Sequence, residues 1–277
     1  MIIDEFNSDS LQKALKNLPL GGILFYPQCT STNDLALNWA AKDAQDLSLV
    51  VTNHQTKGRG RKNRQWISSK DSSLTFSLIL IPTMDESHNY GFYTALGALA
   101  VINSIKQIND KVEPKIKWPN DILINDKKVS GVLIEASWIG SAIEKVVLGI
   151  GINITKEAVP HPDLVSYPAT SLEDVLPKPI NRAELLYKII NEIIELRKTI
   201  DTSKVIAAWE ENLAFRGSSV EVWEDEHQTR RGILTGLTQD GALRLLDAEN
   251  KESIIHFGEM HLRPALLKHA SSEENMV

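Results

Sequence analysis

Hydrophobic and polar residues divide the chain into segments whose periodicity predicts secondary structure. Segments that alternate between apolar and polar residues, or are wholly apolar, predict strands, and segments with apolar residues every three or four positions predict amphipathic helices. Strands are expected at Ser48–Thr52, Ser73–Ile81, Lys115–Trp118, Ile122–Ile124, Val129–Ala136 and Val146–Ile154. Helices are expected at Asn33–Lys42, Tyr90–Asn109 and Val205–Leu213, and from Asn181 onward.

Local signals mark where some of these elements begin. Ser31 or Thr32 can cap the first helix, and Asn181 with Glu184 forms an Asn-x-x-Glu capping box. The residues Asn125–Lys127 have the composition of a hairpin turn between two strands. Two interior glycines in the long helix that follows residue 90 predict close packing against a neighbouring element.

The second half of the chain changes character twice. Thr155–Pro179 is proline-rich and irregular, which predicts a lid or a disordered loop. From Phe215 to Pro264, short strands alternate with tight turns and predict a small all-β barrel. Its strands are expected at Ser219–Trp223, Arg231–Leu237, Ala242–Leu246 and Ser253–Phe257. The polar tail from Ala265 is expected to fray.

Composition narrows the class of protein. The 277-residue chain has a net charge of −6, which argues against a general polyanion partner such as duplex DNA. A single cysteine, Cys29, excludes an internal disulfide and fits a reducing compartment. The N-terminus has no secretory pattern, and the apolar runs are too short to span a bilayer. We therefore expect a soluble cytoplasmic protein with no membrane partner.

The stretch Gly58–Trp66 is the most informative motif. It places four cationic side chains and two glycines in nine positions, so we expect it to be poorly ordered without a ligand. Ordering costs roughly 1–2 kcal/mol per residue, and each charge-assisted hydrogen bond returns roughly 1.5–3 kcal/mol. A triphosphate or an acyl phosphate could supply enough bonds. The alternative is a solvated basic loop.

Four other polar clusters each allow two interpretations. Ser31–Asn33 either caps a helix or binds a compact polar head group such as a urea or amide. Lys117–Asp121 either forms a turn or suits a nucleotide with its magnesium. Lys127–Gly131 carries hairpin lysines that are usually only solvated. Gly149–Asn153 resembles half of a dinucleotide fingerprint but lies within a strand, where a glycine can let a ligand approach closely.

Other catalytic signatures are missing from the sequence. The histidines have no zinc-type spacing and there is no Cys-x-x-Cys motif. The Gly-x-Ser-x-Gly and P-loop signatures are also missing, which disfavours an acyl-enzyme hydrolase and a Walker-type ATPase.

Taken together and in order, the clusters resemble the biotin protein ligase family. The motifs that carry the resemblance are Ser31–Asn33, Gly58–Trp66, Lys117–Asp121, Lys128–Gly131 and Gly149–Asn153. The likeness covers about residues 24–264, and the set is highly specific although no single motif is.

The resemblance implies an α+β fold, in which a mixed β-sheet flanked by helices resembles the catalytic domain of class II aminoacyl-tRNA synthetases. A small C-terminal SH3-like β-barrel is expected to follow. The expected division is 1–213 for the catalytic domain, 214–265 for the β domain and 266–277 for a polar tail. Many bacterial relatives carry an N-terminal helix-turn-helix repressor domain. Only about twenty-five residues precede the first strand that the resemblance implies, which is too few for that module, so a ligase-only form is expected.

The resemblance also implies an activity. Family members make biotinyl-5′-AMP from biotin and MgATP, and then transfer the biotinyl group to a lysine of a biotin carboxyl carrier domain. The expected protein is a biotin–[acetyl-CoA-carboxylase] ligase that uses Mg²⁺ with its substrates and has no tightly bound prosthetic group. Its expected partner is the carrier domain of a biotin-dependent carboxylase, and its expected state is a monomer or a homodimer.

Roles for individual residues follow from the same resemblance. The residues implied in biotin binding are Ser31, Thr32, Asn33, Gln55, Arg59, Gly60, Arg61 and Lys128. Those implied in ATP or adenylate binding are Trp66, Lys117, Asn120 and Asn153, with Asp121 as the magnesium-linked carboxylate. Arg59, Arg61 and Lys128 are expected to be catalytic, because a carboxylate that attacks an α-phosphate brings two anions together.

One departure from the family pattern concerns the loop itself. Asn63 stands where the family usually has glycine. Asparagine tolerates the left-handed region better than most residues, so we expect only slight stiffening.

Two alternatives remain. A lipoate or octanoate ligase would share the catalytic fold, but those relatives lack the Gly-Arg-Gly-Arg loop. A ligand-sensing regulator that binds nucleic acid would use the same basic loop, although the acidic chain argues against it.

Overall fold

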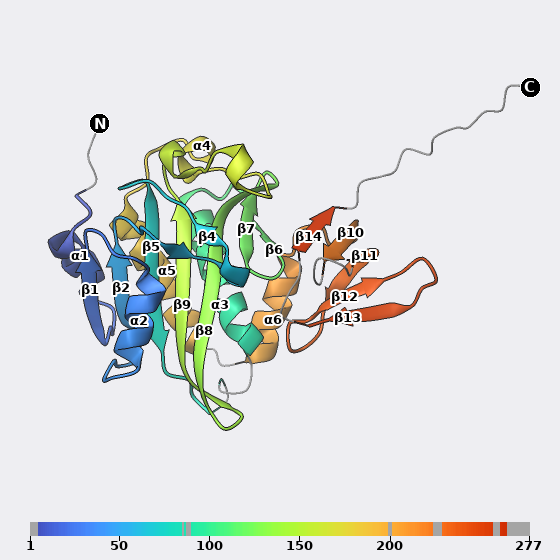
Figure 1. The fold of residues 1–277 in the computed structure, drawn as a ribbon, viewed down its shortest axis with the longest axis horizontal. Coiled ribbons are helices and arrows are strands. Elements are labelled where there is room, and N and C mark those ends of the chain that lie inside the picture. Colours follow the sequence, from blue (N-terminus) through green and yellow to red (C-terminus); the bar gives the residue numbers. More distant parts are fainter. Residues whose placement is uncertain are drawn as a thin grey trace, which may run out of the picture.

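Seven strands form the central sheet of the computed structural model, which describes residues 5–84, 86, 90–198, 201–223, 229–256 and 261–264 (Figure 1). The strand order is β1-β2-β5-β9-β8-β7-β6. The bounds are β1 (Gly22–Tyr26), β2 (Ser48–Thr52), β5 (Ser73–Leu80), β6 (Lys115–Lys117), β7 (Asp121–Ile124), β8 (Lys127–Ile139) and β9 (Ala142–Asn153). β1 and β2 are parallel and the other neighbours antiparallel, so the expected mixed sheet is confirmed.

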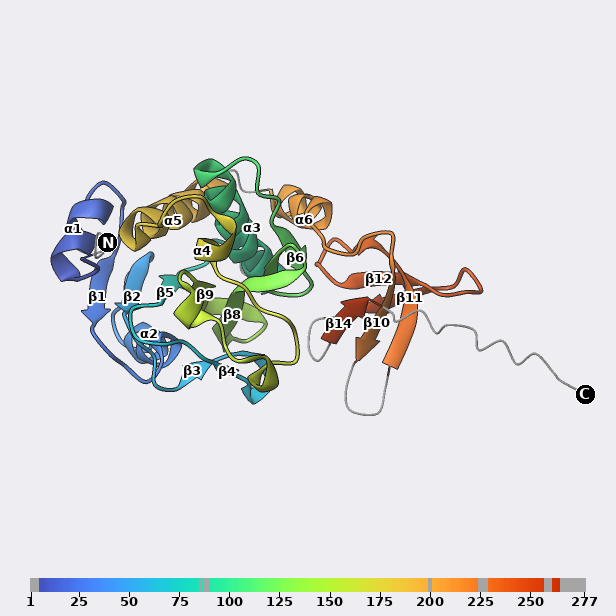
Figure 2. The ribbon, with the colours of Figure 1, turned by 90° about the horizontal axis from the view of Figure 1, so that it is seen from above.

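Helices cover both faces of this sheet. Figure 2 shows α1 (Ser8–Leu15), α3 (Tyr90–Ile108) and α5 (Arg182–Lys198) on one face, and α2 (Thr32–Ala40) on the other. A short helix, α6 (Thr202–Glu211), follows α5 and packs beside α3. The sequence pattern did not predict α1, which is only eight residues long.

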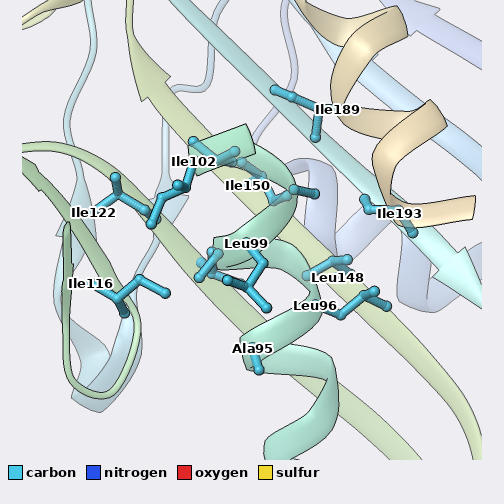
Figure 3. Close-up of a cluster of buried hydrophobic side chains, with 14 of the residues drawn as sticks. Ala95, Leu96, Leu99, Ile102, Ile116, Ile122, Leu148, Ile150, Ile189 and Ile193 are labelled. Carbon is cyan, nitrogen blue, oxygen red and sulfur yellow. The ribbon is translucent and has the colours of Figure 1, made fainter. Parts of the chain in front are cut away.

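The main core lies between the sheet and α3. Figure 3 shows Leu96 and Leu99 of α3 beside Leu148 of β9, with Ile189 of α5 near by, and all four side chains are buried. A Cβ on Gly97 would lie 2.7 Å from Cδ1 of Leu148, so glycine allows α3 to approach the sheet. The close packing that the sequence predicted for this helix is confirmed at that position.

Most element boundaries agree with the expected ones. Ser31 caps α2, and the side chain of Asn181 accepts a hydrogen bond from the backbone of Glu184 at 2.9 Å. Asn125 and Asp126 both have positive φ, as a tight hairpin turn requires. The hairpin of β8 and β9 extends to Ile139 and Ala142, several residues beyond the apolar segments that predicted it, because backbone pairing continues where side chains are exposed.

A second sheet contains the C-terminal strands. Its order is β13-β12-β11-β10-β14, and every pair is antiparallel. The bounds are β10 (Ser219–Trp223), β11 (Thr229–Leu237), β12 (Leu243–Leu246), β13 (Glu252–Ile255) and β14 (His261–Pro264). In the described ranges β13 and β14 are the two edges, so the sheet is open and the expected SH3-like barrel is not confirmed. Phe257 and the tail from Ala265 lie outside the described residues.

Polar bonds join the second sheet to the first part of the chain. The buried indole of Trp118 donates to the carbonyl of Gly241 at 3.0 Å. Glu210 of α6 accepts from the backbone N–H of Leu237 at 2.7 Å and pairs with Arg216 at 2.7 Å. Among the described residues, no helix combines the length and the apolar character that crossing a membrane requires.

Arg197, near the end of α5, forms the most buried ion pair of the helical layer. Its guanidinium contacts Glu86 at 2.8 Å and Asp46 at 3.0 Å, and only 1% of the Glu86 side chain is exposed. Burial alone would raise the pKa of Glu86, but Arg197 and the backbone of Thr83 outweigh it and hold the pKa below its usual range.

We predict that Arg197→Met lowers the free energy of unfolding by about 3–5 kcal/mol at neutral pH, because it leaves a buried carboxylate unpaired. Chemical denaturation measures this change. A carboxyl whose folded pKa is depressed stabilises the protein above its unfolded pKa and loses that contribution as the pH falls through the folded pKa. The difference between the two proteins should therefore shrink in acid.

Lys198→Met is the matched control for this prediction. Lys198 is the next residue, is largely exposed and pairs with exposed Glu195. Its loss should change stability by no more than about 0.5 kcal/mol. Equal effects of the two substitutions would contradict the prediction.

Candidate functional site

A cavity of about 400 Å³ lies on the face of the sheet opposite α3 and α5. The start of α2, the hairpin of β3 (Gly58–Arg59) and β4 (Gln65–Trp66), strands β7 to β9, and the segment 160–169 border it. Every residue that the sequence analysis assigned to a site contributes to its wall. These residues are Ser31, Thr32, Asn33, Gln55, Arg59, Gly60, Arg61, Trp66, Lys117, Asn120, Asp121, Lys128 and Asn153. Segments far apart in sequence thus meet in one place.

At the end of the cavity beside α2, the lining side chains Ser31, Thr32, Asn33 and Gln55 are uncharged and polar. The side chain of Gln55 accepts hydrogen bonds from the backbone N–H of Thr32 at 2.7 Å and from its hydroxyl at 3.1 Å. The hydroxyl of Ser77, on β5, lies 2.8 Å from the Thr32 hydroxyl and 2.6 Å from Oδ1 of Asn33. Ser31, Thr32, Asn33 and Ser77 are all buried. The donors and acceptors at this end are therefore held in fixed directions.

Sequence reasoning missed Ser77. The signal that could have found it is the alternation of small polar residues along β5, where Ser73, Thr75 and Ser77 lie on one face of an otherwise apolar strand. A buried hydroxyl in the centre of a sheet needs a partner, and α2 supplies one for Ser77.

Two glycines of β9 shape the cavity wall. A Cβ at Gly149 would lie 2.0 Å from Oδ1 of Asn33, and one at Gly151 would lie 2.6 Å from the ring of Trp66. Glycine was expected here to let a ligand approach the strand. The space above each glycine is instead taken by one of the protein's own side chains, which form the cavity wall.

The basic stretch forms a two-stranded hairpin, not an irregular loop. Gly58 pairs with Trp66 and Arg59 with Gln65, and a left-handed Lys62 (φ 54°) turns the chain between them. The guanidinium of Arg59 contacts Asp34 of α2 at 2.5 Å and Glu135 of β8 at 2.7 Å. Carboxylates from two other elements thus offset the repulsion among the clustered cations, which the sequence alone could not show.

The end of the cavity farthest from Ser31–Asn33 is lined by charged side chains. Asp121 is buried and contacts Lys128 at 2.6 Å and Lys117 at 3.7 Å. Burial alone would raise the pKa of Asp121, but the two lysines outweigh it and hold the pKa below its usual range. Burial lowers the pKa of Arg61, against the opposing effects of Tyr90 and Asp121. The end of the cavity opposite Ser31–Asn33 is therefore cationic.

The segment 160–169 forms the outer wall at this end. Backbone bonds join it to β8, since the N–H of Lys128 donates to the carbonyl of Pro168 at 2.8 Å. The ring of Tyr167 lies 4.5 Å from Nζ of Lys117. Sequence reasoning expected a lid or a disordered loop in this region but did not single out Tyr167. An aromatic residue in a proline-rich segment carries no periodic signal.

The two amides expected near a nucleotide base also line the cavity. Nδ2 of Asn120 donates to the carbonyl of Val132 at 2.6 Å, and Nδ2 of Asn153 donates to the carbonyl of Thr170 at 3.0 Å. Because the nitrogen of each side-chain amide is bonded to a backbone carbonyl of the cavity wall, the direction of that amide's own oxygen is fixed.

The residues present do not suit a metal ion held by the protein alone. No group of three or more His, Cys, Asp or Glu side chains comes together among the described residues. One oxygen of Asp121 already faces Lys128 and the other faces Lys117. An ion would therefore be held mainly by the oxygens of a bound phosphate.

Comparisons with known proteins agree with this geometry. Residues 25–153 match the model of the biotin/lipoate A/B protein ligase family. The chain is 29% identical over 244 residues to a Mycobacterium tuberculosis protein named biotin–[acetyl-CoA-carboxylase] ligase, a match that spans 85% of this chain and 87% of the relative. The chain is therefore similar to the biotin protein ligase family.

A solved structure shares the fold. The Aquifex aeolicus biotin protein ligase, in complex with biotin and ATP, superposes with a TM-score of 0.75 at 29% identity, over 88% of this chain and 99% of that one. The chain is also 34% identical, over 67% of its length, to the bifunctional ligase/repressor BirA of Bacillus subtilis. This match spans only 57% of the Bacillus relative.

We predict that Gly149→Ala destabilises the protein by about 1–3 kcal/mol, because the new methyl group overpacks the buried amide of Asn33. Urea denaturation measures the loss. In an Asn33→Ala background the same substitution should cost much less, since the clashing atom is gone. Equal costs in the two backgrounds would mean that the clash is not the cause.

Proposed function

We propose that the protein is a biotin–[acetyl-CoA-carboxylase] ligase, which activates biotin as biotinyl-5′-AMP and transfers it to a lysine of a biotin carboxyl carrier domain. The observation that carries the proposal is one cavity with a buried, uncharged polar end and a cationic far end. Biotin has the same two-part chemistry, a neutral urea head and an anionic carboxylate. The relatives' names point to the same reaction.

The polar end suits the urea head of biotin. A urea offers two N–H donors and one carbonyl acceptor, and Ser31, Thr32, Asn33 and Gln55 offer hydroxyl and amide groups of both kinds. Buried groups left without a partner are costly, so such a site discriminates against heads that cannot bond to it. The head of lipoate is an apolar disulfide ring, which makes a lipoate or octanoate ligase the weaker candidate.

The cationic end suits the first chemical step. The carboxylate of biotin attacks the α-phosphorus of ATP, a new C–O–P bond forms, and pyrophosphate leaves with the electrons of the broken P–O bond. Two anions must approach each other, so positive charge from Arg59, Arg61 and Lys128 lowers the barrier. Trp66 forms an apolar wall for the nucleotide, and Lys117, Asn120 and Asn153 line its site.

Magnesium enters this proposal as part of the substrate MgATP. The phosphates would supply most of its ligands. The sequence-based role of Asp121 as a metal ligand does not fit well with its two lysine contacts. Within the proposal, Asp121 balances the charge of Lys117 and Lys128 until a phosphate binds.

The second step is the transfer to the carrier. The ε-amine of the acceptor lysine attacks the acyl carbon, the amide bond forms, and AMP leaves. The anhydride hydrolyses in water, so the hairpin that includes Gly60 would cover it between the two steps. The proposal also includes a cytoplasmic location, a catalytic unit at 1–213 and an SH3-like β unit at 214–265.

The direct test is to mix the protein with biotin, MgATP and a carrier domain and to weigh the carrier. A mass increase of one biotinyl group that requires both substrates is expected. A carrier modified by lipoate and not by biotin would replace this proposal with the lipoate ligase. No modification by either would overturn it.

We predict that Lys128→Ala lowers the rate of biotin-dependent ATP–pyrophosphate exchange by roughly a hundredfold, because one cation that faces the developing charge is lost. Lys127→Ala is the matched control, since Lys127 is the adjacent residue and is exposed. It should keep the wild-type rate. Similar rates in the two variants would count against the role of Lys128.

A further inference from the structure

Arg59 is held by two acidic residues that no motif singled out. Asp34 lies in the first turn of α2 and Glu135 in the middle of β8, and both contact the guanidinium at 2.7 Å or less. These two contacts connect the basic hairpin to α2 and to β8. The guanidinium thus contacts two carboxylates of the protein, while Arg59 also borders the cavity.

Glu135 makes a second contact, at the polar end of the cavity. Its Oε1 atom faces Arg59, and its Oε2 atom accepts a hydrogen bond from Nδ2 of Asn33 at 2.9 Å. Oδ1 of Asn33 faces the hydroxyl of Ser77 at 2.6 Å. A carboxylate only accepts, so Glu135 determines which way the Asn33 amide points. One carboxylate thus joins the hairpin to the end of the cavity proposed for the head group.

We propose that Glu135 is a positioning residue that couples the orientation of Asn33 to closure of the basic hairpin through Arg59, with Asp34 as a second anchor. The coupling to substrate rests on the proposed function, in which Asn33 reads the head of biotin. A bound head group that keeps the Asn33 amide in place also keeps Glu135 aimed at Arg59, which holds the hairpin over the adenylate.

The exposure of these groups is consistent with a reversible contact. The side chains of Arg59 and Asp34 are each 42% exposed, and that of Glu135 is 21% exposed. Ion pairs at such positions are weak one at a time and are screened by salt. Two of them on one guanidinium can hold the hairpin closed without preventing the opening that substrate entry and carrier access require.

The first experiment needs no substrate. Trypsin cleaves after Arg and Lys, and the hairpin contains four such sites, so the rate of cleavage within residues 58–66 reports its opening. Glu135→Gln removes the charge with little change in size. We expect hairpin cleavage roughly five- to tenfold faster than in the wild type, with an unchanged melting temperature. Rising salt should reduce the difference in cleavage rate between the wild type and the variant, because salt weakens the Arg59–Glu135 ion pair of the wild type.

Matched variants separate the coupling from a general effect. Glu144→Gln removes a carboxylate from the same β8–β9 hairpin, where it faces Ser137, and should leave cleavage unchanged. Asp34→Asn breaks only the second anchor and should give a smaller acceleration, which keeps the test usable if Glu135→Gln folds poorly. With Arg59→Gln as background, adding Glu135→Gln should change cleavage little.

The second experiment measures substrate handling. Glu135→Gln should release biotinyl-5′-AMP roughly five- to tenfold faster and raise the KM for biotin, with a smaller effect on kcat for the exchange reaction. Wild-type cleavage and adenylate retention in this variant would overturn the coupling, even if the wild-type protein biotinylates its carrier. If the wild type forms no adenylate but the variant still speeds hairpin cleavage, the proposed function fails and the structural link remains.

Discussion

Charge compensation is the constraint on which the cavity depends. Several positive side chains line the cavity, and like charges repel one another. Three carboxylates offset this repulsion, with Asp121 between two lysines and with Asp34 and Glu135 on Arg59. Arg59, Lys117 and Lys128 are therefore held in place before substrate arrives, and less ordering remains to be done on binding.

The same carboxylates connect parts of the site that have different tasks. Glu135 contacts both the hairpin and Asn33, and Asp121 contacts both Lys128 and Lys117. Glycines at positions 149 and 151 provide the space for this arrangement on β9. The helical face of the sheet supplies the rigid support, since α3 and α5 pack there over the main hydrophobic core (Figure 3).

In the proposed function, the polar end of the cavity serves recognition and the cationic end serves the chemical step. Within that proposal, the buried polar end gains selectivity because its hydroxyls and amides are held in fixed directions by bonds to one another, which suits only a head group of matching polarity. The cationic end acts through charge, which suits phosphates in general, and so gives reactivity more than selectivity. The hairpin and the segment 160–169 border the cavity, so they are placed to exclude water from a reactive anhydride.

The sequence by itself determined the elements of the catalytic fold and nearly all of the cavity's polar residues, because periodicity and motif composition are local properties. Glu135 and Tyr167 could not be found that way, since their roles come from neighbours distant in the chain. The expected barrel is an open sheet in the described residues, because closure depends on edge pairing that strand patterns do not encode. Only the tertiary structure decided which carboxylate faces which cation, since an ion pair is set by position in space and not by order in the chain.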